Sequence, residues 1–195
     1  MKSARPVETT DKNNNQKLSN EYKIVGLLGR GGFGVVYKGQ RKADGLKVAI
    51  KEVAKEKAPV TEDNVPREAV LLRLLVDVPG VIKILNHMET KKSYHIIMEC
   101  FGCMDLYDFI SEKGTLAEDL ARGIFRQLLE TVIECHKRGV FHSDIKDENI
   151  LIDKDSGRIR LIDFGSGKFL HDGIFFEFEG TRIYSPPEWI SSRFI

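Results

Sequence analysis

The clearest feature of the hydrophobic pattern is a pair of short apolar runs separated by a polar turn. The runs span residues 150–152 and 159–162, and the turn at 153–157 contains Asp, Ser and Gly. β-Branched residues on both sides of such a turn predict a β-hairpin. Because a hairpin brings its two open ends together, we expect Asn149 and Asp163 to lie at the same edge.

The remaining periodicity predicts a set of strands followed by helices. Alternating apolar residues indicate strands, and apolar residues three or four positions apart indicate amphipathic helices. Residues 1–20 are polar and Asn-rich without any periodicity, so they are expected to form a disordered tail. Strands are expected at residues 22–39, 48–51, 81–85 and 94–98, and helices at 65–78, 104–111 and 115–138.

The longest expected helix carries signals at both ends. Thr115 and Glu118 have the spacing of a capping box, and a basic last turn is followed by Gly139. Its role is expected to be structural, because it would carry the loop that follows it. Its apolar stripe is expected to consist of Leu120, Ile124, Leu128 and Val132.

Composition and charge narrow the classes of partner. The chain has 195 residues, of which 42% are hydrophobic, and this is enough to build a globular core. Thirty basic and 29 acidic residues give a net charge of +1, which argues against nucleic acid or an anionic membrane as a partner. No apolar run approaches the length that spans a membrane.

The cysteines offer one alternative chemistry. Three cysteines are too few for a disulfide scaffold, which favours a reducing compartment. Cys100 and Cys103 have the spacing of a redox pair or of half a zinc site. Neither a second pair nor a His cluster accompanies them in the sequence, so we expect neither role.

The open end of the expected hairpin offers oxygen ligands. Asn149 and Asp163 would supply an amide oxygen and a carboxylate, which suit Mg²⁺ that keeps waters and phosphate oxygens as its other ligands. Asp144 precedes Asn149 on a turn that can face the same edge. A carboxylate beside a metal-held phosphate can orient a hydroxyl and take its proton.

A glycine-rich stretch near the N-terminus fits phosphate binding. Gly29, Gly31 and Gly34 have the spacing Gly-x-Gly-x-x-Gly, which dinucleotide-binding folds share. Such folds need a helix directly after the glycines, whereas Val35 and Val36 continue a strand. The stretch therefore predicts a hairpin turn whose bare backbone can lie over phosphates, although a merely flexible hairpin has the same composition.

Together these motifs resemble the eukaryotic protein kinases of the Ser/Thr branch. His142, Asp144, Lys146 and Asn149 match the catalytic-loop pattern, and Asp163, Phe164 and Gly165 match the Asp-Phe-Gly motif. The resemblance runs in order and spacing over residues 22–195, and several strings, such as 145–153 and 161–167, are similar to the Pim kinase family. Ser143 departs from the pattern, because most kinases have Arg there, and residues 99–102 lack the Pim proline.

The resemblance implies an α+β, two-lobed protein kinase fold. Residues 21–98 would form a small lobe of mainly antiparallel strands with one helix, and residues 99–103 the hinge. Residues 104–195 would form a helical large lobe that is incomplete, because kinase large lobes normally continue through further helices. On this basis we expect the chain to be a fragment or a truncated gene product, with the small lobe folding best.

The resemblance also implies the chemistry: transfer of the γ-phosphoryl of ATP to Ser or Thr hydroxyls of proteins, with Mg²⁺. Asp144 would orient the hydroxyl, Lys146 would steady the transferred group, and Asn149 and Asp163 would bind the metal. ATP would be bound by the glycine-rich turn, its flanking strands, a buried ion pair and the hinge: Leu28, Gly29, Arg30, Gly31, Gly32, Phe33, Gly34, Val35, Val36, Ala49, Lys51, Glu68, Glu99, Phe101 and Leu151.

Acidic residues near the expected cleft predict protein substrates with Arg or Lys close to the phosphorylated residue. The substrate-binding residues would be Asp105, Asp108, Glu148 and Thr181. A pseudokinase scaffold, or a nucleotide-binding module without transfer, is the alternative function. We expect a monomer in the cytoplasm, with the nucleus as a further location.

Overall fold

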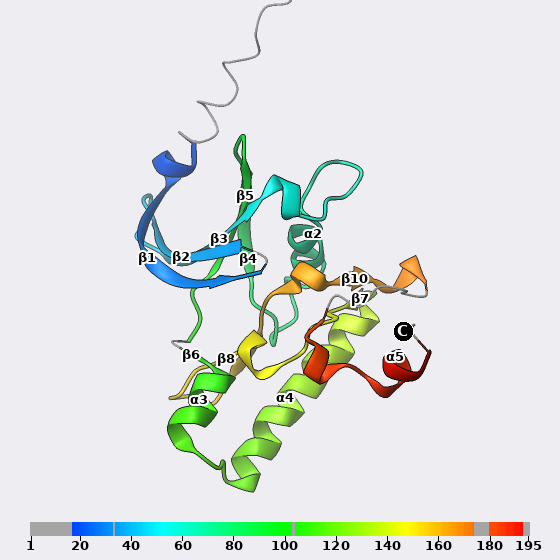
Figure 1. Cartoon of the computed structure of the whole chain (residues 1–195). Coiled ribbons are helices and arrows are strands. Elements are labelled where there is room, and N and C mark those ends of the chain that lie inside the picture. The colour runs from blue at the N-terminus through cyan, green and yellow to red at the C-terminus, as the bar shows by residue number, and fades with distance from the viewer. Residues whose placement is uncertain (1–16, 33, 103, 174–179, 193–195) are drawn as a thin grey trace, which may run out of the picture. The chain divides into compact units, whose positions relative to one another are not determined.

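The computed structural model describes residues 17–32, 34–102, 104–173 and 180–192. The chain divides into two compact units (Figure 1). Unit 1 contains Met1–Ala58 and Ile84–Cys100, and unit 2 contains Pro59–Lys83 and Phe101–Ile195. The predicted small lobe ran without interruption over residues 21–98, whereas Pro59–Lys83, which includes the helix expected at 65–78, falls in unit 2.

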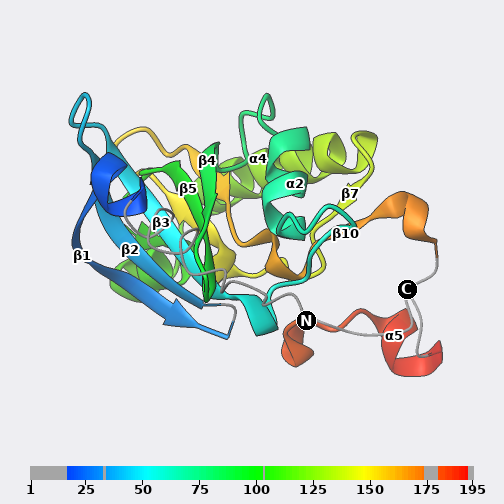
Figure 2. The ribbon, with the colours of Figure 1, turned by 90° about the horizontal axis from the view of Figure 1, so that it is seen from above.

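Unit 1 is an antiparallel sheet of five strands in the order β1-β2-β3-β5-β4 (Figure 2). Apolar residues at every second position, such as Val48 and Ile50, lie on the sheet face that the unit's own core buries. The sheet extends into a short 3₁₀ turn, η1 (Lys55–Lys57). The strands are β1 (Tyr22–Gly31), β2 (Gly34–Arg41), β3 (Lys47–Ala54), β4 (Ile84–Glu89) and β5 (Ser93–Glu99).

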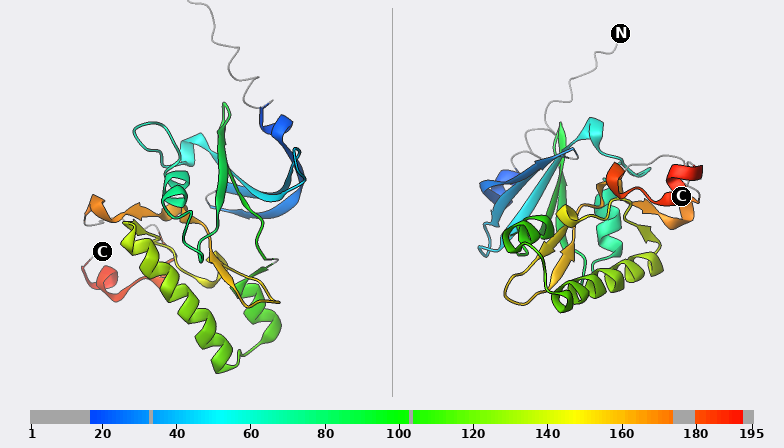
Figure 3. Two further views of the ribbon diagram at one scale, coloured as in Figure 1. Left: turned by 180° about the vertical axis from the view of Figure 1, so that it is seen from behind. Right: turned by 60° about the horizontal axis from the view of Figure 1, so that its bottom comes forward.

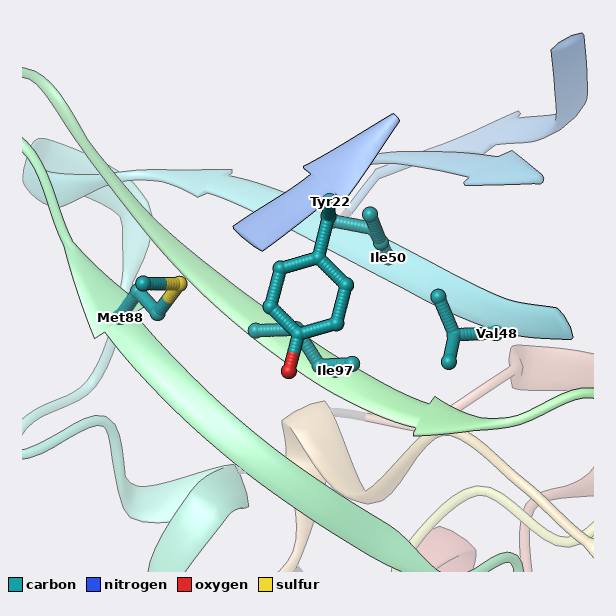
Figure 4. Packing of buried hydrophobic residues seen from close by; sticks show 5 residues of the cluster. All are labelled: Tyr22, Val48, Ile50, Met88 and Ile97. Atoms are coloured by element: carbon teal, nitrogen blue, oxygen red, sulfur yellow. The ribbon is translucent and has the colours of Figure 1, made fainter. Parts of the chain in front are cut away.

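The core of unit 1 covers one face of this sheet. Five buried side chains point toward one another there: Tyr22, Val48, Ile50, Met88 and Ile97 (Figure 4). Leu18 packs against this cluster, and residues 17–21 are helical. Residues 17–20, which the sequence pattern placed in a disordered tail, are therefore ordered by an apolar contact; residues 1–16 lie outside the described part.

Unit 2 is built around the predicted hairpin. β8 (Ile150–Ile152) pairs with β9 (Ile159–Leu161), and β6 (Met104–Asp105) adds a third strand. In the turn, Asp153 Oδ1 accepts hydrogen bonds of 3.0 Å from the backbone of Asp155 and from that of Ser156. Gly157 closes the turn with φ of +65°. The hairpin prediction is confirmed, and its turn chemistry is the one expected of Asp, Ser and Gly.

Two helices of unit 2, α3 (Leu106–Lys113) and α4 (Glu118–Lys137), pack against this hairpin (Figure 3). β7 (Val140–Phe141) follows the longest helix and pairs with β10 (Lys168–Phe169). Within the described ranges, no helix is both long and apolar enough to cross a membrane. The helices are α2 (Arg67–Leu74), α3 (Leu106–Lys113), α4 (Glu118–Lys137) and α5 (Pro187–Ser192), with 3₁₀ turns η2 (Asp147–Asn149), η3 (Phe164–Ser166), η4 (Leu170–Asp172) and η5 (Arg182–Tyr184).

The start of α4 differs from the prediction, whereas its end agrees. The helix begins at Glu118 after Ala117, whose methyl group makes no capping bond, so the predicted capping box at Thr115 is wrong. At the other end Gly139 has φ of +74°, as expected of the residue that ends a helix. No side chain caps the start of the helix. Instead, the carboxylates of Glu118 and Asp119 place negative charge near the free N–H groups of the first turn.

The buried face of α4 matches the predicted stripe in part, since Leu128 and Val132 are half-buried. Ile124 is buried, but Leu120 is 39% exposed, and the buried partners of Ile124 are Thr131 and Cys135. Gln127 lies between them and holds the hairpin: its Nε2 donates to Gly157 O at 2.9 Å. A polar contact to the hairpin therefore adds to the apolar packing of this face, and an apolar stripe alone does not indicate it.

Two other element boundaries, the end of one helix and the start of one strand, differ from the prediction. The helix expected to reach residue 78 ends at Leu74, and Val78 is buried beyond it. The strand expected at 81–85 begins only at Ile84, because Val81 and Ile82 pair with β9: Ile82 N donates to Leu161 O at 3.1 Å.

Substitution of Gly80 should test how tightly α4 packs on this segment. A Cβ at Gly80 would overlap Thr131 Oγ1 and lie 2.8 Å from Thr131 Cβ. Gly80→Ala should therefore lower the free energy of unfolding of unit 2 by roughly 1–3 kcal/mol. Gly123→Ala on α4 is the matched control, because nothing among the described residues lies within 4 Å of its Cβ. It should raise the free energy of unfolding by up to about 1 kcal/mol, measured by urea denaturation.

Candidate active site

Asp144 lies at the centre of the strongest polar cluster in unit 2. Its carboxylate is buried, yet three protein groups donate to it. Thr181 donates from its backbone N–H and from its hydroxyl to Oδ1, each at 2.7 Å. Asn149 Nδ2 donates to Oδ2 at 3.1 Å and to the backbone carbonyl of Asp144 at 2.8 Å. The predicted catalytic carboxylate is therefore fixed in direction by its neighbours.

Lys146 completes a hydroxyl-binding arrangement. Its Nζ donates to Thr181 Oγ1 at 2.9 Å and lies 3.4 Å from Asp144 Oδ2. A hydroxyl is thus held between a carboxylate that can accept its proton and a cation that can stabilise negative charge. The structure brings together Asp144, Lys146, Asn149 and Thr181, all of which the sequence had singled out.

His142 links this cluster to the Asp-Phe-Gly segment. Asp144 N donates to His142 Nδ1 at 3.2 Å, and His142 Nε2 lies 2.9 Å from Ile162 O. A neutral imidazole that carries its proton on Nε2 satisfies both contacts. The ring also packs edge-on against Phe164, with centroids 4.6 Å apart. The side chain therefore fixes the Asp144 loop to the segment that carries Asp163.

The two predicted metal ligands lie at neighbouring positions. Ile162, directly before Asp163, donates its N–H to Asn149 O at 2.9 Å, so the hairpin ends meet as expected. Asp163 has φ of +61°, and its carboxylate accepts a bond of 3.3 Å from Gly165 N. One amide and one carboxylate leave most positions around an ion to other ligands, which fits Mg²⁺ held jointly with phosphates. Among the described residues, no group of three or more His, Cys, Asp or Glu side chains could hold a metal ion.

The glycines of the glycine-rich hairpin in unit 1 are of two kinds. At one of them the fold requires glycine, and at the others a Cβ would fit. Gly34 has φ of +138°, and a Cβ there would overlap Glu52 O, so the fold itself requires glycine. Around Gly29, Gly31 and Gly32, a Cβ would meet nothing within 4 Å among the described residues. Open space above these residues is what a closely approaching phosphate needs. Phe33, at the tip, lies outside the described residues.

Strand register places further predicted residues on one sheet face. Val36 pairs with Gly29 on one side and with Lys51 on the other. Ala49, two residues before Lys51, shares that face because side chains alternate along a strand. Lys51 is only 5% exposed, which is unusual for a lysine and favours a specific role. The other unit 1 predictions lie on strands of the same sheet: Leu28 and Arg30 on β1, Val35 on β2 and Glu99 at the end of β5.

Unit 2 carries the remaining predicted ATP residues. Glu68 lies in the first turn of α2 and is 7% exposed. Leu151 lies on β8, and the Arg160 guanidinium sits 4.4 Å from the centroid of the Phe101 ring. Because these residues and those of unit 1 belong to separate units, their joint role in binding ATP stays a prediction.

The acidic residues have different surroundings. Asp105 caps α3 by accepting a bond of 2.8 Å from Asp108 N, so part of its carboxylate serves the helix. Asp108 and Glu148 are exposed, and α3 packs against η2, which carries Glu148. Of the predicted substrate residues, Asp108 and Glu148 therefore offer the more accessible charges.

The alternative cysteine chemistry gains no support from the described residues. Cys100 is exposed, and Cys103 lies outside the described part. Cys135 is buried, and burial raises the pKa of its thiol to about 12, which leaves it unreactive at neutral pH.

Sequence reasoning missed the contact between Tyr184 and Asp147. Tyr184 donates its hydroxyl to Asp147 Oδ1 at 2.9 Å, and this bond raises the pKa of the Tyr184 hydroxyl. Tyr184 follows Thr181 by three residues, as Asp147 follows Asp144. This equal spacing was the only signal in the sequence that could have indicated the contact.

Comparison with known proteins agrees with this geometry. Residues 22–194 match the family model of the protein kinase domain. The Serine/threonine-protein kinase pim-2 of Danio rerio is 46% identical over 194 residues, which cover 92% of this chain and 63% of that protein. The Serine/threonine-protein kinase prk-2 of Caenorhabditis elegans is 43% identical over 178 residues, 89% of this chain and 40% of that protein.

Among solved structures, the Cydia pomonella granulovirus kinase PK-1 superposes with a TM-score of 0.77 at 23% identity, covering 94% of this chain and 65% of that one. At this identity the likeness shows the fold alone. The chain thus spans less than two thirds of the length of these relatives. The kinase fold and the similarity to Pim kinases predicted from the motifs are confirmed, and the chain belongs to the protein kinase family.

Proposed function

We propose that this chain transfers the γ-phosphoryl of ATP to Ser or Thr hydroxyls of proteins. The observation that carries this proposal is the hydroxyl of Thr181, held 2.7 Å from Asp144 Oδ1 and 2.9 Å from Lys146 Nζ. The same groups can therefore bind an aliphatic hydroxyl at the distance that proton transfer needs. Both relatives carry the name serine/threonine-protein kinase, which supports the same substrate class.

Four polar residues of unit 2 have roles in this proposal: Asp144, Lys146, Asn149 and Asp163. Asp144 orients the acceptor hydroxyl and accepts its proton, while Asn149 holds the carboxylate in that direction. Lys146 offsets the negative charge that develops on the transferred group. Asn149 and Asp163 would hold Mg²⁺, which when bound neutralises charge on the phosphates.

The residues of unit 1 supply nucleotide binding. The open backbone at Gly29 and Gly31 would lie over the phosphates, and Lys51 would contact them. The pair that Lys51 is expected to form with Glu68 joins residues of different units. Val36 and Ala49 would offer an apolar surface to the adenine, and Leu151 of unit 2 is a further expected ATP residue.

Substitution of Asp144 tests phosphoryl transfer directly. Asp144→Asn keeps the size of the side chain and its bond from Thr181 but removes the proton acceptor. The rate of transfer to a Ser-containing peptide should fall by roughly 10²–10⁴-fold, while the affinity for ATP should change little. Radiolabelled transfer and nucleotide titration measure the two effects. Tight ATP binding by the unaltered chain without any transfer would instead support the alternative of a nucleotide-binding module.

The glycines allow a matched test of nucleotide binding. Gly31→Ala adds a methyl group in open space, so the fold should melt as before while the KM for ATP rises severalfold because the phosphates are displaced. Gly34→Ala should lower the free energy of unfolding of unit 1 by roughly 1–3 kcal/mol, because φ is +138° and Glu52 O blocks the Cβ. If Gly31→Ala left the KM for ATP unchanged, the hairpin would not contact the phosphates.

We further propose that the preferred substrates carry Arg or Lys near the phosphorylated residue. Asp108 and Glu148 present exposed carboxylates from neighbouring elements, and carboxylates bind guanidinium groups in bidentate fashion. The substrate class is therefore basic peptide segments rather than acidic ones.

Charge-removing variants at these two acids should raise the KM for a basic peptide. Asp108→Asn and Glu148→Gln should each raise it by roughly threefold to tenfold, with little effect on a peptide whose basic residues are replaced by Ala. Glu130→Gln, which removes an exposed carboxylate of α4, is the matched control and should behave as the unaltered chain. Equal KM values for basic and neutral peptides in the unaltered chain would contradict the preference.

A further inference from the structure

The four residues Thr181–Tyr184, here called the docking segment, contact the catalytic loop at both ends. Thr181 bonds to Asp144, and Tyr184 bonds to Asp147. Between these anchors Arg182 is exposed and Ile183 is 87% exposed. The segment is therefore hydrogen-bonded to the loop at both ends. Its first and last side chains contact the loop, and the two between them are exposed to solvent.

The backbone of the segment fixes the spacing of the anchors. Tyr184 N donates to Thr181 O at 2.9 Å and forms a 3₁₀ turn. This turn places residues three apart on the same side, as in any 3₁₀ helix. On the loop, the matching acceptors are also three apart, at Asp144 and Asp147, so both bonds can form together.

The bond at Tyr184 differs in kind from the one at Thr181. Thr181 touches the carboxylate that the proposed reaction uses, whereas Tyr184 binds a carboxylate three residues away. A segment fixed at one end can pivot about that end, and a second bond removes this freedom. A hydroxyl that donates to a carboxylate forms a charge-assisted bond, stronger than one between neutral groups.

We propose that Tyr184 is a positioning residue, which orients the docking segment for the acceptor peptide through its hydrogen bond to Asp147. The proposal rests on the proposed protein kinase function for its effect on catalysis. It also gives Asp147 a role different from that of its neighbour Glu148: Asp147 is an acceptor for Tyr184 and not a contact for basic substrate residues.

Limited proteolysis tests the anchor without any enzyme assay. Trypsin can cleave after Arg182, which lies between the anchors, and the rate reports how often the segment opens. Tyr184→Phe keeps the ring but removes the donor, so cleavage at this bond should be roughly two- to fivefold faster. Tyr107→Phe on α3 is the matched control, since Tyr107 is 53% and Tyr184 47% exposed, and its rate should equal that of the unaltered chain. An unchanged rate for Tyr184→Phe would overturn the proposal.

Variants of Asp147 test whether this residue serves as the hydrogen-bond acceptor for Tyr184 or as a charged contact for the substrate. Asp147→Ala removes the acceptor and should match Tyr184→Phe. Asp147→Asn keeps an acceptor oxygen but loses the charge, so its cleavage rate should lie between that of Asp147→Ala and that of the unaltered chain. The double variant Tyr184→Phe/Asp147→Ala should be no faster than either single variant, because all three lack the same bond. Additive effects, or equal effects of Asn and Ala, would contradict the proposed role of Asp147.

Steady-state kinetics then tests the positioning role. Tyr184→Phe should raise the KM for the acceptor peptide several fold and leave the KM for ATP unchanged, because the segment contacts the loop and not the nucleotide residues. A change in the KM for ATP alone would overturn this role. If the unaltered chain transfers no phosphoryl group, the proposed function fails, whereas the proteolysis rates still decide whether Tyr184 anchors the segment.

Discussion

The backbone pairing of Leu161 is the interaction on which the rest of unit 2 depends. Leu161 is fully buried; its N–H donates to Gly80 O at 2.7 Å, and its carbonyl accepts from Ile82 at 3.1 Å. On its other side it pairs with Ile150 of the hairpin. A slip of one residue in this register would turn every side chain of β9 to the opposite face. It would also separate the two ends of the hairpin, where the metal ligands are expected.

A second constraint is the cost of burying Asp144. A carboxylate removed from water is costly unless donors replace the lost solvent. Here Thr181 and Asn149 supply those donors, and the Lys146 ammonium lies 3.4 Å away. The same groups that satisfy the charge also hold a hydroxyl in place, so stability and the proposed chemistry use one set of contacts. A loop that lost Thr181 would lose both.

The hairpin and the cluster around Asp144 were predictable because local chemistry encodes them. Asp153 and Gly157 specify the turn, and motif spacing specifies the loop, whatever the rest of the chain does. The burial of Thr131 on α4 was not predictable, because this side chain packs where Gly80 leaves room for it. The bond from Tyr184 to Asp147 likewise depends on two segments that meet in space, and pairing between distant segments leaves no periodic trace in a sequence.

Backbone strain is concentrated where these constraints meet. Among the described residues other than glycine, only Asn64, Ser143 and Asp163 have positive φ, and two of the three flank the site, at +70° and +61°. Each such residue costs of order 1–3 kcal/mol and persists only when its surroundings fix it. The His142 side chain provides that fixation, because it binds Asp144 N on one side and Ile162 O on the other. The imidazole therefore holds two strained turns against each other, which explains why a buried, neutral ring lies between the carboxylate of the loop and the segment that carries Asp163.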